Sequence, residues 1–466
     1  MRMKEELRKS GKFWLPASPA HSVSGTLFIS DGGRIELEIL GELEPPQTFI
    51  YAINSNRQPE RINGCIESFG EVTLIGCFYR KRNFTFPRQI SKSRIHAHKV
   101  LLGAWYGEDE LLLFNTLEFS IEGLNEWVGI NGFSSTIEPS NNSINLNYTL
   151  PANISFELSD GIQLDIGFSA STPSFPISQS ATIEQRTYFK LSSRTALELD
   201  ELLNLAFQLT TFVGFGLDAT VSLNSVVATT DDLVQELDEG RTIPHKLEII
   251  YQSLPFAIEP PKIEWFNMLF GFREVRDRFS DVLKNWFSAY DNIGPALNLY
   301  FSVTNGGQKF LESQFLALAQ CLETYHRRTS PEKLMDDEVF SSLLETIMKG
   351  CPEEHKEWLT GRLQFGNELS LSKRIKKIID PFKQLLGSSN DRSSLIRSIV
   401  NTRNYLTHYN HDLEEIASTG KDLLPLCKKM EAIFQLHLLD VIGFTQEEIV
   451  SIHKNSNGLK SKFNGY

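Results

Sequence analysis

Residues 403 to 408 place an arginine and a histidine close together at the end of a predicted helix. Arg403 is followed directly by Asn404, and His408 comes five positions after Arg403. An imidazole can take up and release a proton near neutral pH, and a guanidinium can hold two oxygens of a phosphate. These groups are the smallest set of side chains that could cut RNA without a metal, because the RNA 2′-hydroxyl is itself the nucleophile.

The spacing of this pair is weak evidence by itself, so the helix that carries it has to be considered. With 22 Arg and 10 His among 466 residues, chance gives about half a match at any one fixed offset. We expect a helix over residues 391–410, with Asp391 as its N-cap and an apolar stripe along it (Leu395, Ile399 and Leu406).

The positions of Arg403 and His408 around that helix point to a second copy of the chain. Five residues turn an α-helix by about 500°, so the two side chains lie about 140° apart. One helix therefore does not easily close both groups around one phosphate. Two copies related by a two-fold axis could do so, and a homodimer is part of the hypothesis.

A basic stretch lies in front of the pair, within a chain whose formal net charge is −12. Residues 373–408 hold eight basic and two acidic side chains, a net charge of +6. Phosphate binding depends on Lys and Arg, so this stretch is the candidate RNA-binding surface. The plainer interpretation is a solvated helix face. The residues we expect to contact RNA are Lys373, Arg374, Lys376, Lys377 and Arg397.

Composition excludes several other classes of protein. Hydrophobic residues make up 41% of the chain and charged residues 22%, as in ordinary globular proteins. The five cysteines are scattered without a CxxC pair, which argues against a zinc site or a disulfide framework. No signal peptide or membrane span is expected, so we predict a cytoplasmic protein. No phosphate-binding loop, GxSxG or HExxH motif is present, and we predict no metal and no cofactor.

The first part of the chain reads as strands. Alternating apolar and polar residues occur at 35–39, 144–148, 154–158 and 162–166, which is typical of a sheet with one solvated face. The period changes to that of a helix over about residues 193–216. We therefore predict a β-rich, sandwich-like domain over residues 1–255, with that helix as an insert.

The remaining part reads as helices. Paired prolines at 260 and 261 predict a boundary near residue 256. Beyond it, apolar residues recur at helical spacing (Val275, Phe279, Val282, Leu283 and Trp286). We predict an all-α domain over residues 256–450, an α+β protein as a whole, and a flexible C-terminal tail over residues 451–466.

The Arg-Asn-x-x-x-His pattern resembles the HEPN ribonuclease superfamily, because it comes late in an all-α domain. A long helix rich in Leu and Phe precedes it and ends Leu322-Glu-Thr-Tyr-His326. Residues 315–326 of that helix, together with the β-rich first half, look more narrowly like ApeA-type HEPN proteins. The HEPN resemblance covers roughly residues 265–450, and the ApeA-like resemblance extends over most of the chain.

This resemblance implies a metal-independent endoribonuclease of anti-phage defence that acts as a two-fold dimer. Arg403 and His408 would act together, with Asn404 as the polar residue that often follows the arginine. The products would carry 2′,3′-cyclic phosphates, and the substrate would be host RNA, possibly tRNA. HEPN enzymes sometimes add an acidic residue near the pair, for which Glu323 is the candidate. An ion pair with Arg327, four residues on, is an equally good interpretation of Glu323.

Three hypotheses for function remain open. In the first, the β-rich half senses a phage-derived trigger and restrains or releases the nuclease. In the second, the helical half is a catalytically inactive HEPN module that only binds RNA or a partner protein. In the third, the sandwich binds a carbohydrate or phage component, and the helices serve as an oligomerisation scaffold.

Overall fold

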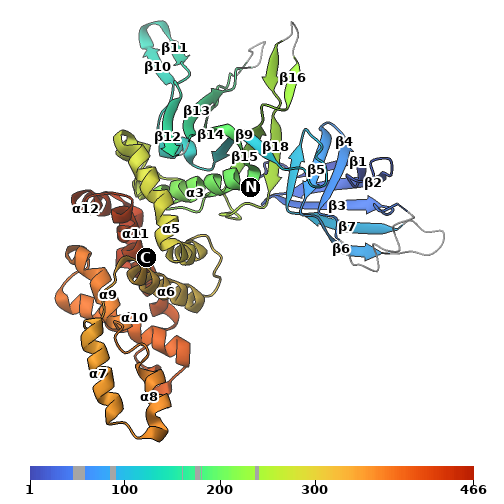
Figure 1. Cartoon of the computed structure of the whole chain (residues 1–466). Coiled ribbons are helices and arrows are strands. Elements are labelled where there is room, and N and C mark those ends of the chain that lie inside the picture. Colours follow the sequence, from blue (N-terminus) through green and yellow to red (C-terminus); the bar gives the residue numbers. More distant parts are fainter. Residues whose placement is uncertain are drawn as a thin grey trace. The chain divides into compact units, whose positions relative to one another are not determined.

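The computed structural model describes residues 1–45, 58–83, 91–159, 161–173, 179, 181–236 and 241–465. They form two compact units, Met1–Ser280 and Asp281–Tyr466. The first unit is rich in β-strands and the second is helical, which confirms the α+β class (Figure 1). The first unit is one compact body and not two.

The boundary between the units lies later in the chain than the paired prolines suggested. The predicted break at residue 256 is followed by a segment that still belongs to the first unit, including α4 (Phe272–Val275). Trp127, on α2 (Leu124–Val128), packs its ring against Phe270, Phe272 and Phe279 at centroid distances of 6.5, 6.0 and 6.1 Å. This aromatic cluster holds residues 270–279 to the β-rich unit, so the boundary falls at residue 280.

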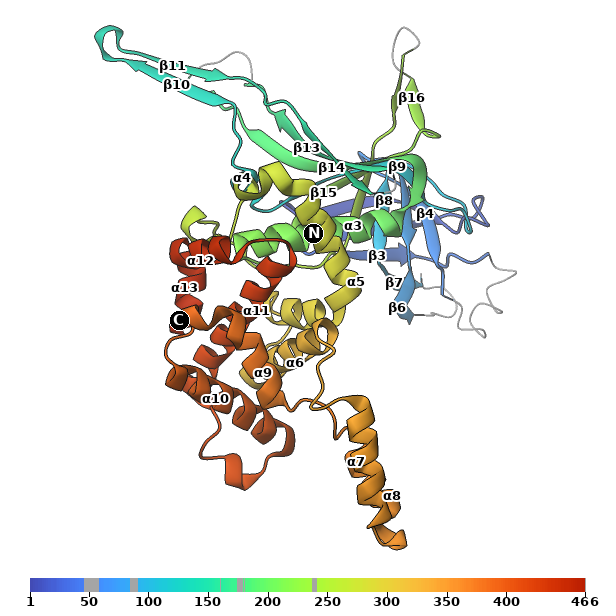
Figure 2. The ribbon, with the colours of Figure 1, turned by 60° about the vertical axis from the view of Figure 1, so that its left-hand side comes forward.

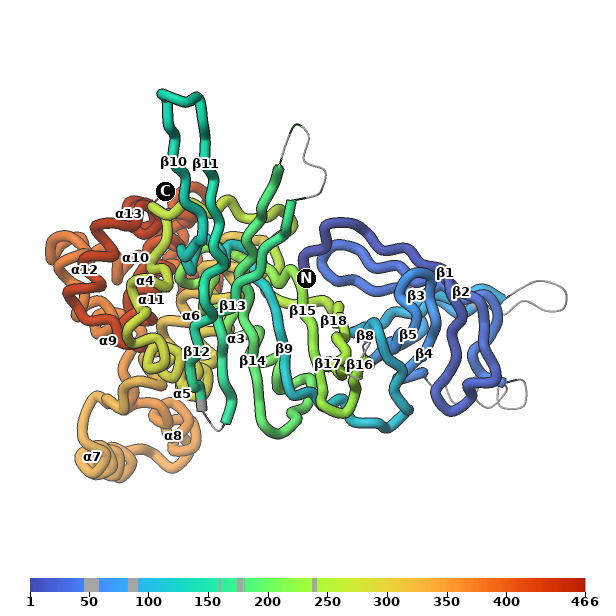
Figure 3. The backbone as a smooth tube through the Cα atoms, turned by 90° about the horizontal axis from the view of Figure 1, so that it is seen from above, coloured from blue at the N-terminus to red at the C-terminus, as the bar shows by residue number. Residues whose placement is uncertain are grey.

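One large sheet dominates the first unit. Among the described residues, fourteen strands join in the order β12-β13-β14-β9-β15-β18-β8-β5-β4-β1-β2-β3-β7-β6. Every recorded pairing in it is antiparallel, and Figure 3 shows β12, β13, β14 and β9 side by side. The strands thus join into one hydrogen-bonded antiparallel sheet. Their bounds are β1 (Leu7–Trp14), β2 (Val23–Ser30), β3 (Arg34–Leu40), β4 (Arg61–Ile66), β5 (Gly70–Ile75), β6 (Phe78–Asn83), β7 (Lys92–Ala97), β8 (Lys99–Leu102), β9 (Leu113–Ile121), β12 (Ile154–Ser159), β13 (Ile162–Ala170), β14 (Gln185–Glu198), β15 (Leu223–Thr229) and β18 (Leu247–Tyr251).

Strand β3 shows why these segments form strands. Its Ile35, Leu37 and Ile39 are completely buried, while Glu36 and Glu38 lie on the other face. Both carboxylates form ion pairs with other strands, Glu36 with Arg80 of β6 and Glu38 with Lys92 of the adjacent β7. Burial of one face and solvation of the other is what the alternating pattern predicts.

Helix α3 (Leu199–Leu217) lies across strands of this sheet, as Figure 1 shows. Its buried side chains include Leu202, Ala206, Leu209 and Val213, at helical spacing. The predicted start near residue 193 is too early, because β14 continues to Glu198. The end of β14 still pairs with β9 there, for example at Leu197 and Phe114.

Two short hairpins stand apart from the large sheet. One consists of β10 (Phe133–Glu138) and β11 (Ser143–Tyr148), and the other of β16 (Val234–Glu236) and β17 (Thr242–Pro244). Figure 2 shows the β10–β11 hairpin extending beyond the strands that precede and follow it. The alternation at 144–148 therefore does mark a strand, but one outside the main sheet.

The second unit is built from helices. Helix α6 packs against α9, α10 and α11, and these four position the residues of interest. Helix α5 is kinked at Ile293, because Pro295 lacks the N–H that would continue the helical ladder. Helices α7 and α8 project from the others as a separate hairpin (Figure 2). The helices are α5 (Phe279–Thr304), α6 (Leu311–Thr329), α7 (Asp337–Lys349), α8 (Lys356–Leu363), α9 (Leu371–Ile379), α10 (Ser389–His408), α11 (Leu423–Val441), α12 (Gln446–Asn455) and α13 (Asn457–Asn464).

The end of the chain is folded, so the predicted flexible tail from residue 451 is a wrong prediction through Asn464. Helix α13 packs against α11, where Leu459 is completely buried. Lys462 forms an ion pair of 2.6 Å with Glu431 of α11, and Lys428 forms a second one of 2.9 Å with the same carboxylate. These two cations hold the pKa of Glu431 below its usual range against the opposing effect of burial.

Candidate active site on helix α10

Helix α10 begins with a capping box that fixes its register. Ser388 is the N-cap, and its hydroxyl accepts a hydrogen bond from the Asp391 N–H at 3.2 Å. Asp391 in turn accepts one from the Ser388 N–H at 2.8 Å, so it sits at the third helical position and is not the N-cap that we predicted. The Ser388 hydroxyl also donates to the Asp391 carboxylate at 2.7 Å, and this hydrogen bond together with the one from the Ser388 N–H lowers the pKa of the Asp391 carboxyl.

The buried stripe of α10 determines how far Arg403 and His408 are exposed to solvent. Ile399, Thr402 and Leu406 are buried against the other helices. Arg403 is half-buried, and His408 is exposed as the last residue of the helix. The chain then turns at Tyr409, whose positive φ of 49° ends the helix while its N–H donates to the Tyr405 carbonyl at 2.6 Å.

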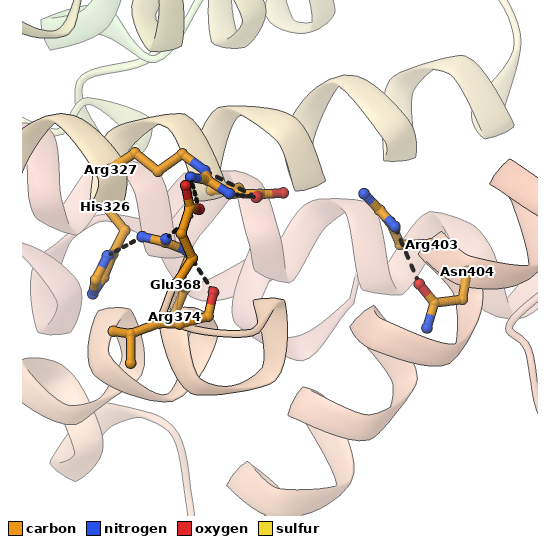
Figure 4. A network of polar contacts seen from close by, with 8 residues as sticks. His326, Arg327, Glu368, Arg374, Arg403 and Asn404 are labelled. Carbon is orange, nitrogen blue, oxygen red and sulfur yellow. Dashed lines mark hydrogen bonds and ion pairs between the residues drawn. The ribbon is translucent and has the colours of Figure 1, made fainter. Parts of the chain in front are cut away.

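Arg403 has no acidic partner among the residues that the structure describes. Its Nη1 donates to the side-chain oxygen of Asn404 at 3.2 Å, as Figure 4 shows. Within the described part of the chain no carboxylate forms an ion pair with this guanidinium. The amide is neutral, so it orients the arginine without cancelling its charge. Arg403 therefore keeps a positive charge that a phosphate could meet.

Two arginines near α6, Arg327 and Arg374, are paired with acids, and Glu323 takes part in the same network. Arg327 donates to Glu323 at 3.0 and 3.1 Å and also contacts Glu368. Figure 4 shows this network as a separate group, with no dashed line to Arg403 or Asn404. Glu323 thus forms the i,i+4 ion pair that was the alternative interpretation. The described residues show no hydrogen bond from Glu323 to Arg403 or His408.

Arg374, one of the predicted RNA-binding residues, is part of the same network and is buried. Its exposed fraction is only 4%, and its guanidinium donates to the Leu369 carbonyl (3.0 Å) and to Glu368 (3.2 Å). A third contact of 3.2 Å joins it to Nδ1 of His326. Burial and the Arg374 charge lower the pKa of His326, so its ring is neutral and accepts this hydrogen bond. In this structure Arg374 cannot reach RNA, and the prediction for it is wrong.

We expect Arg374→Ala to destabilise the helical unit by about 3 kcal/mol, because it leaves buried acceptors on α6 and on the loop before α9 unsatisfied. Chemical denaturation would measure this. Lys373→Ala is the matched control, since Lys373 is the exposed neighbour on the same helix and should change stability by less than about 0.5 kcal/mol. Unchanged stability together with weaker RNA binding in Arg374→Ala would contradict the structural role.

The remaining basic residues do lie on exposed surfaces. Lys373, Lys376 and Lys377 share one face of α9, at i, i+3 and i+4, while Ile375, Ile378 and Ile379 are buried on the other. Lys377 forms an exposed ion pair of 3.0 Å with Glu332. Arg397 is exposed on α10.

A hollow beside the end of α10 was not predicted from the sequence. It has a volume of about 420 Å³ and includes Phe310, Glu312, Tyr405 and Tyr409 in its walls. The i,i+4 spacing of the two tyrosines was a visible signal for a shared helix face. The contribution of Phe310 and Glu312, at the start of α6, could not be seen without the fold.

Neither a metal cluster nor a membrane helix is found in what the structure describes. Its residues contain no group of three or more His, Cys, Asp or Glu side chains placed to hold a metal ion. None of its helices has the length and apolar character needed to cross a bilayer.

Comparison with known proteins agrees with the architecture. The ApeA N-terminal domain 1 family matches residues 8–286, more than half of the chain, and the Apea-like HEPN family matches residues 316–448. The second match contains Arg403, Asn404 and His408. No curated protein and no solved structure matches the chain significantly. With a β-rich unit and a helical unit that correspond to these two domains, the chain belongs to the ApeA-like HEPN proteins.

Proposed function

We propose that this chain is a metal-independent endoribonuclease of anti-phage defence, with Arg403 and His408 acting on the RNA backbone. Membership of the ApeA-like HEPN family supports an effector of this kind, since HEPN domains are generally ribonucleases. The observation that carries the assignment is the contrast between arginines. Arg327 and Arg374 contact carboxylates, whereas the half-buried Arg403 is held by a neutral amide five residues before an exposed histidine.

The reaction needs a base, an acid and a cation. The RNA 2′-oxygen attacks the adjacent phosphorus while a neutral imidazole takes its proton, and the bond from phosphorus to the 5′-oxygen breaks. The leaving 5′-oxygen takes a proton from an imidazolium, which leaves a 2′,3′-cyclic phosphate on one fragment and a 5′-hydroxyl on the other. Arg403 stabilises the negative charge that builds up on the phosphate oxygens.

Two copies of the chain complete this site. Arg403 and His408 diverge by about 140° around α10, so one copy does not readily present both to one phosphate. A two-fold dimer in which α10 faces its symmetry mate supplies two histidines, one as base and one as acid, and two arginines. Light scattering on the purified protein should give the mass of a dimer.

The rest of the chain serves substrate binding and control in this proposal. The exposed residues Lys373, Lys376, Lys377 and Arg397 contact the RNA backbone. The substrate is host RNA with accessible loops, such as tRNA, in the cytoplasm, because unpaired segments expose both base and 2′-hydroxyl. The β-rich unit responds to a phage-derived trigger and keeps the nuclease inactive until then.

A substrate that lacks one hydroxyl tests the chemistry. Once a cut site is mapped, an RNA with a single 2′-deoxy nucleotide on the 5′ side of that cut should resist cleavage there, while cuts elsewhere continue. EDTA should leave the remaining cuts unchanged, because no step uses a metal. Cleavage at the 2′-deoxy position would refute 2′-hydroxyl attack, and loss of all cuts in EDTA would refute metal independence.

A further inference from the structure

The hollow beside α10 opens next to the proposed catalytic histidine. Its walls come from the start of α6, the last turn of α10 and the segment that follows, and they include Phe310, Glu312, Tyr405, Tyr409, Ser418 and Thr419. Tyr405 lies three residues before His408, which places it about 60° away around the helix and about 4.5 Å along it. Tyr409 follows His408 directly. A group bound in this hollow would therefore lie close to the phosphate on which His408 acts.

Aromatic rings form one side of the hollow. The rings of Tyr405 and Tyr409 meet edge to face at 5.6 Å, while Phe310 and Tyr409 are 73% and 66% exposed. Unpaired nucleobases stack on such rings, and this stacking stabilises the bound base. Packing into a core would explain buried rings, but the rings of Phe310 and Tyr409 are exposed to solvent.

The segment after α10, which supplies Ser418 and Thr419 to the hollow, is held in place by hydrogen bonds. The Ser418 N–H donates to the buried Thr402 hydroxyl of α10 at 2.9 Å, which ties the segment after the helix back to it. Asn410 caps the short turn His411–Leu413 by accepting from the Asp412 N–H at 3.1 Å. These hydrogen bonds fix the segment in one conformation, which lowers the entropy cost of binding a ligand beside it.

Glu312 gives the hollow its polarity. It is exposed in the first turn of α6, and within the described chain its carboxylate has no recorded hydrogen bond or ion pair. A carboxylate near a helix N-terminus is favourable on its own account. Here, however, it also borders exposed aromatic rings. An ionised carboxylate can only accept hydrogen bonds, so a ligand bound to it has to be a donor.

We propose that this hollow binds the nucleobase beside the cut phosphate and selects guanine. The Watson–Crick edge of guanine presents the N1–H and the 2-amino group side by side, so both can donate to the two oxygens of Glu312. Adenine and cytosine each offer one amino group, and uracil would set carbonyl oxygens against the carboxylate. The base must be unpaired, because pairing occupies the same edge. The role in cleavage rests on the proposed ribonuclease function, whereas binding of the base does not.

Binding of mononucleotides to the full-length chain tests the site without cleavage. Saturation-transfer NMR with 3′-GMP at millimolar concentration should give strong signals from the base, and 3′-UMP should give weak ones. Glu312→Gln should weaken 3′-GMP binding at least tenfold and remove the preference over 3′-UMP, and Tyr409→Ala should weaken both. Glu447→Gln is the control, because Glu447 is exposed in the first turn of α12. Equal signals from the two nucleotides, or no effect of Glu312→Gln, would overturn the proposal.

Mapping of cut sites separates this inference from the proposed function. In wild-type chain, cuts should lie next to unpaired guanines, and Glu312→Gln should spread them to other bases while His408 still cuts. Cuts whose position does not depend on Glu312 would overturn the base-binding role but leave the ribonuclease intact. Selective 3′-GMP binding without any RNA cleavage would support the site and refute the ribonuclease.

Discussion

Replacement of His408 by alanine should reduce RNA cleavage by about 10²–10⁴-fold and leave the fold intact. The imidazole is the proton carrier in the proposed reaction, and removing a general acid or base costs a factor of this size. His408 is exposed at the last position of α10, so its loss should change stability by less than about 0.5 kcal/mol. Cleavage rates, thermal unfolding and RNA binding should all be measured on the same preparation.

His411→Ala is the matched control for this variant. His411 is also exposed, lies three residues further on, and contacts Glu414 at 3.3 Å outside the proposed site. It should cut RNA at the wild-type rate. If His408→Ala cut as fast as His411→Ala, then His408 would have no catalytic role and the helical unit would be an RNA- or protein-binding module.

Replacement of Arg403 by lysine should reduce cleavage by about 10²–10³-fold, although the charge is conserved. An ammonium cannot form two parallel hydrogen bonds to a phosphate, which a guanidinium can. The substitution would also remove the planar guanidinium that donates to Asn404. Because the effect concerns the transition state, the dissociation constant for RNA should change far less than the cleavage rate.

Arg397→Lys is the matched control, because it makes the same arginine-to-lysine exchange at another position of α10. Arg397 is exposed and lies on α10 six residues before Arg403. As a backbone contact it needs only charge, so cleavage by this variant should stay within about threefold of wild type. Wild-type cleavage by Arg403→Lys would show that Arg403 also supplies charge alone, and would contradict the bidentate role.

The helices and the Arg403–His408 motif could be predicted because each depends on residues that are close together in the sequence. The stripe through Ile399 and Leu406 predicts which side of α10 is buried, and therefore that Arg403 and His408 lie at its edge or outside it. The predicted N-cap of α10 was wrong by three positions, because Ser388 and Asp391 both suit a helix start. Only the reciprocal hydrogen bonds distinguish the N-cap from the third helical position.

The wrong prediction for Arg374 came from its charge alone, because the face of the helix on which it lies was not considered. Arg374 stood in a basic run, yet it shares its face with Ile375, Ile378 and Ile379 and is buried with them. Its partners Glu368 and His326 come from outside α9, so no local pattern shows the pairing. The tail was misjudged for a similar reason, since Lys462 is held by Glu431 on a helix far back in the sequence.

The hollow proposed to bind a base could not be predicted from the sequence, because its residues come from distant parts of the chain. Phe310 and Glu312 lie about 100 residues before Tyr405 and Tyr409 in the chain. Packing of α6 against α10 brings them together, and the contact between Ser418 and Thr402 closes the third side. Residues that meet only through tertiary packing carry no common spacing.

The ends of the RNA fragments test the central claim most directly. Purified chain and its His408→Ala variant should be incubated in EDTA with total cellular RNA and lysate from phage-infected cells, and the fragment ends should be sequenced. We expect discrete cuts that carry 2′,3′-cyclic phosphates with the wild-type chain and none with the variant. Absence of cuts, 3′-hydroxyl ends, or the same cuts from both proteins would contradict a ribonuclease that acts through Arg403 and His408.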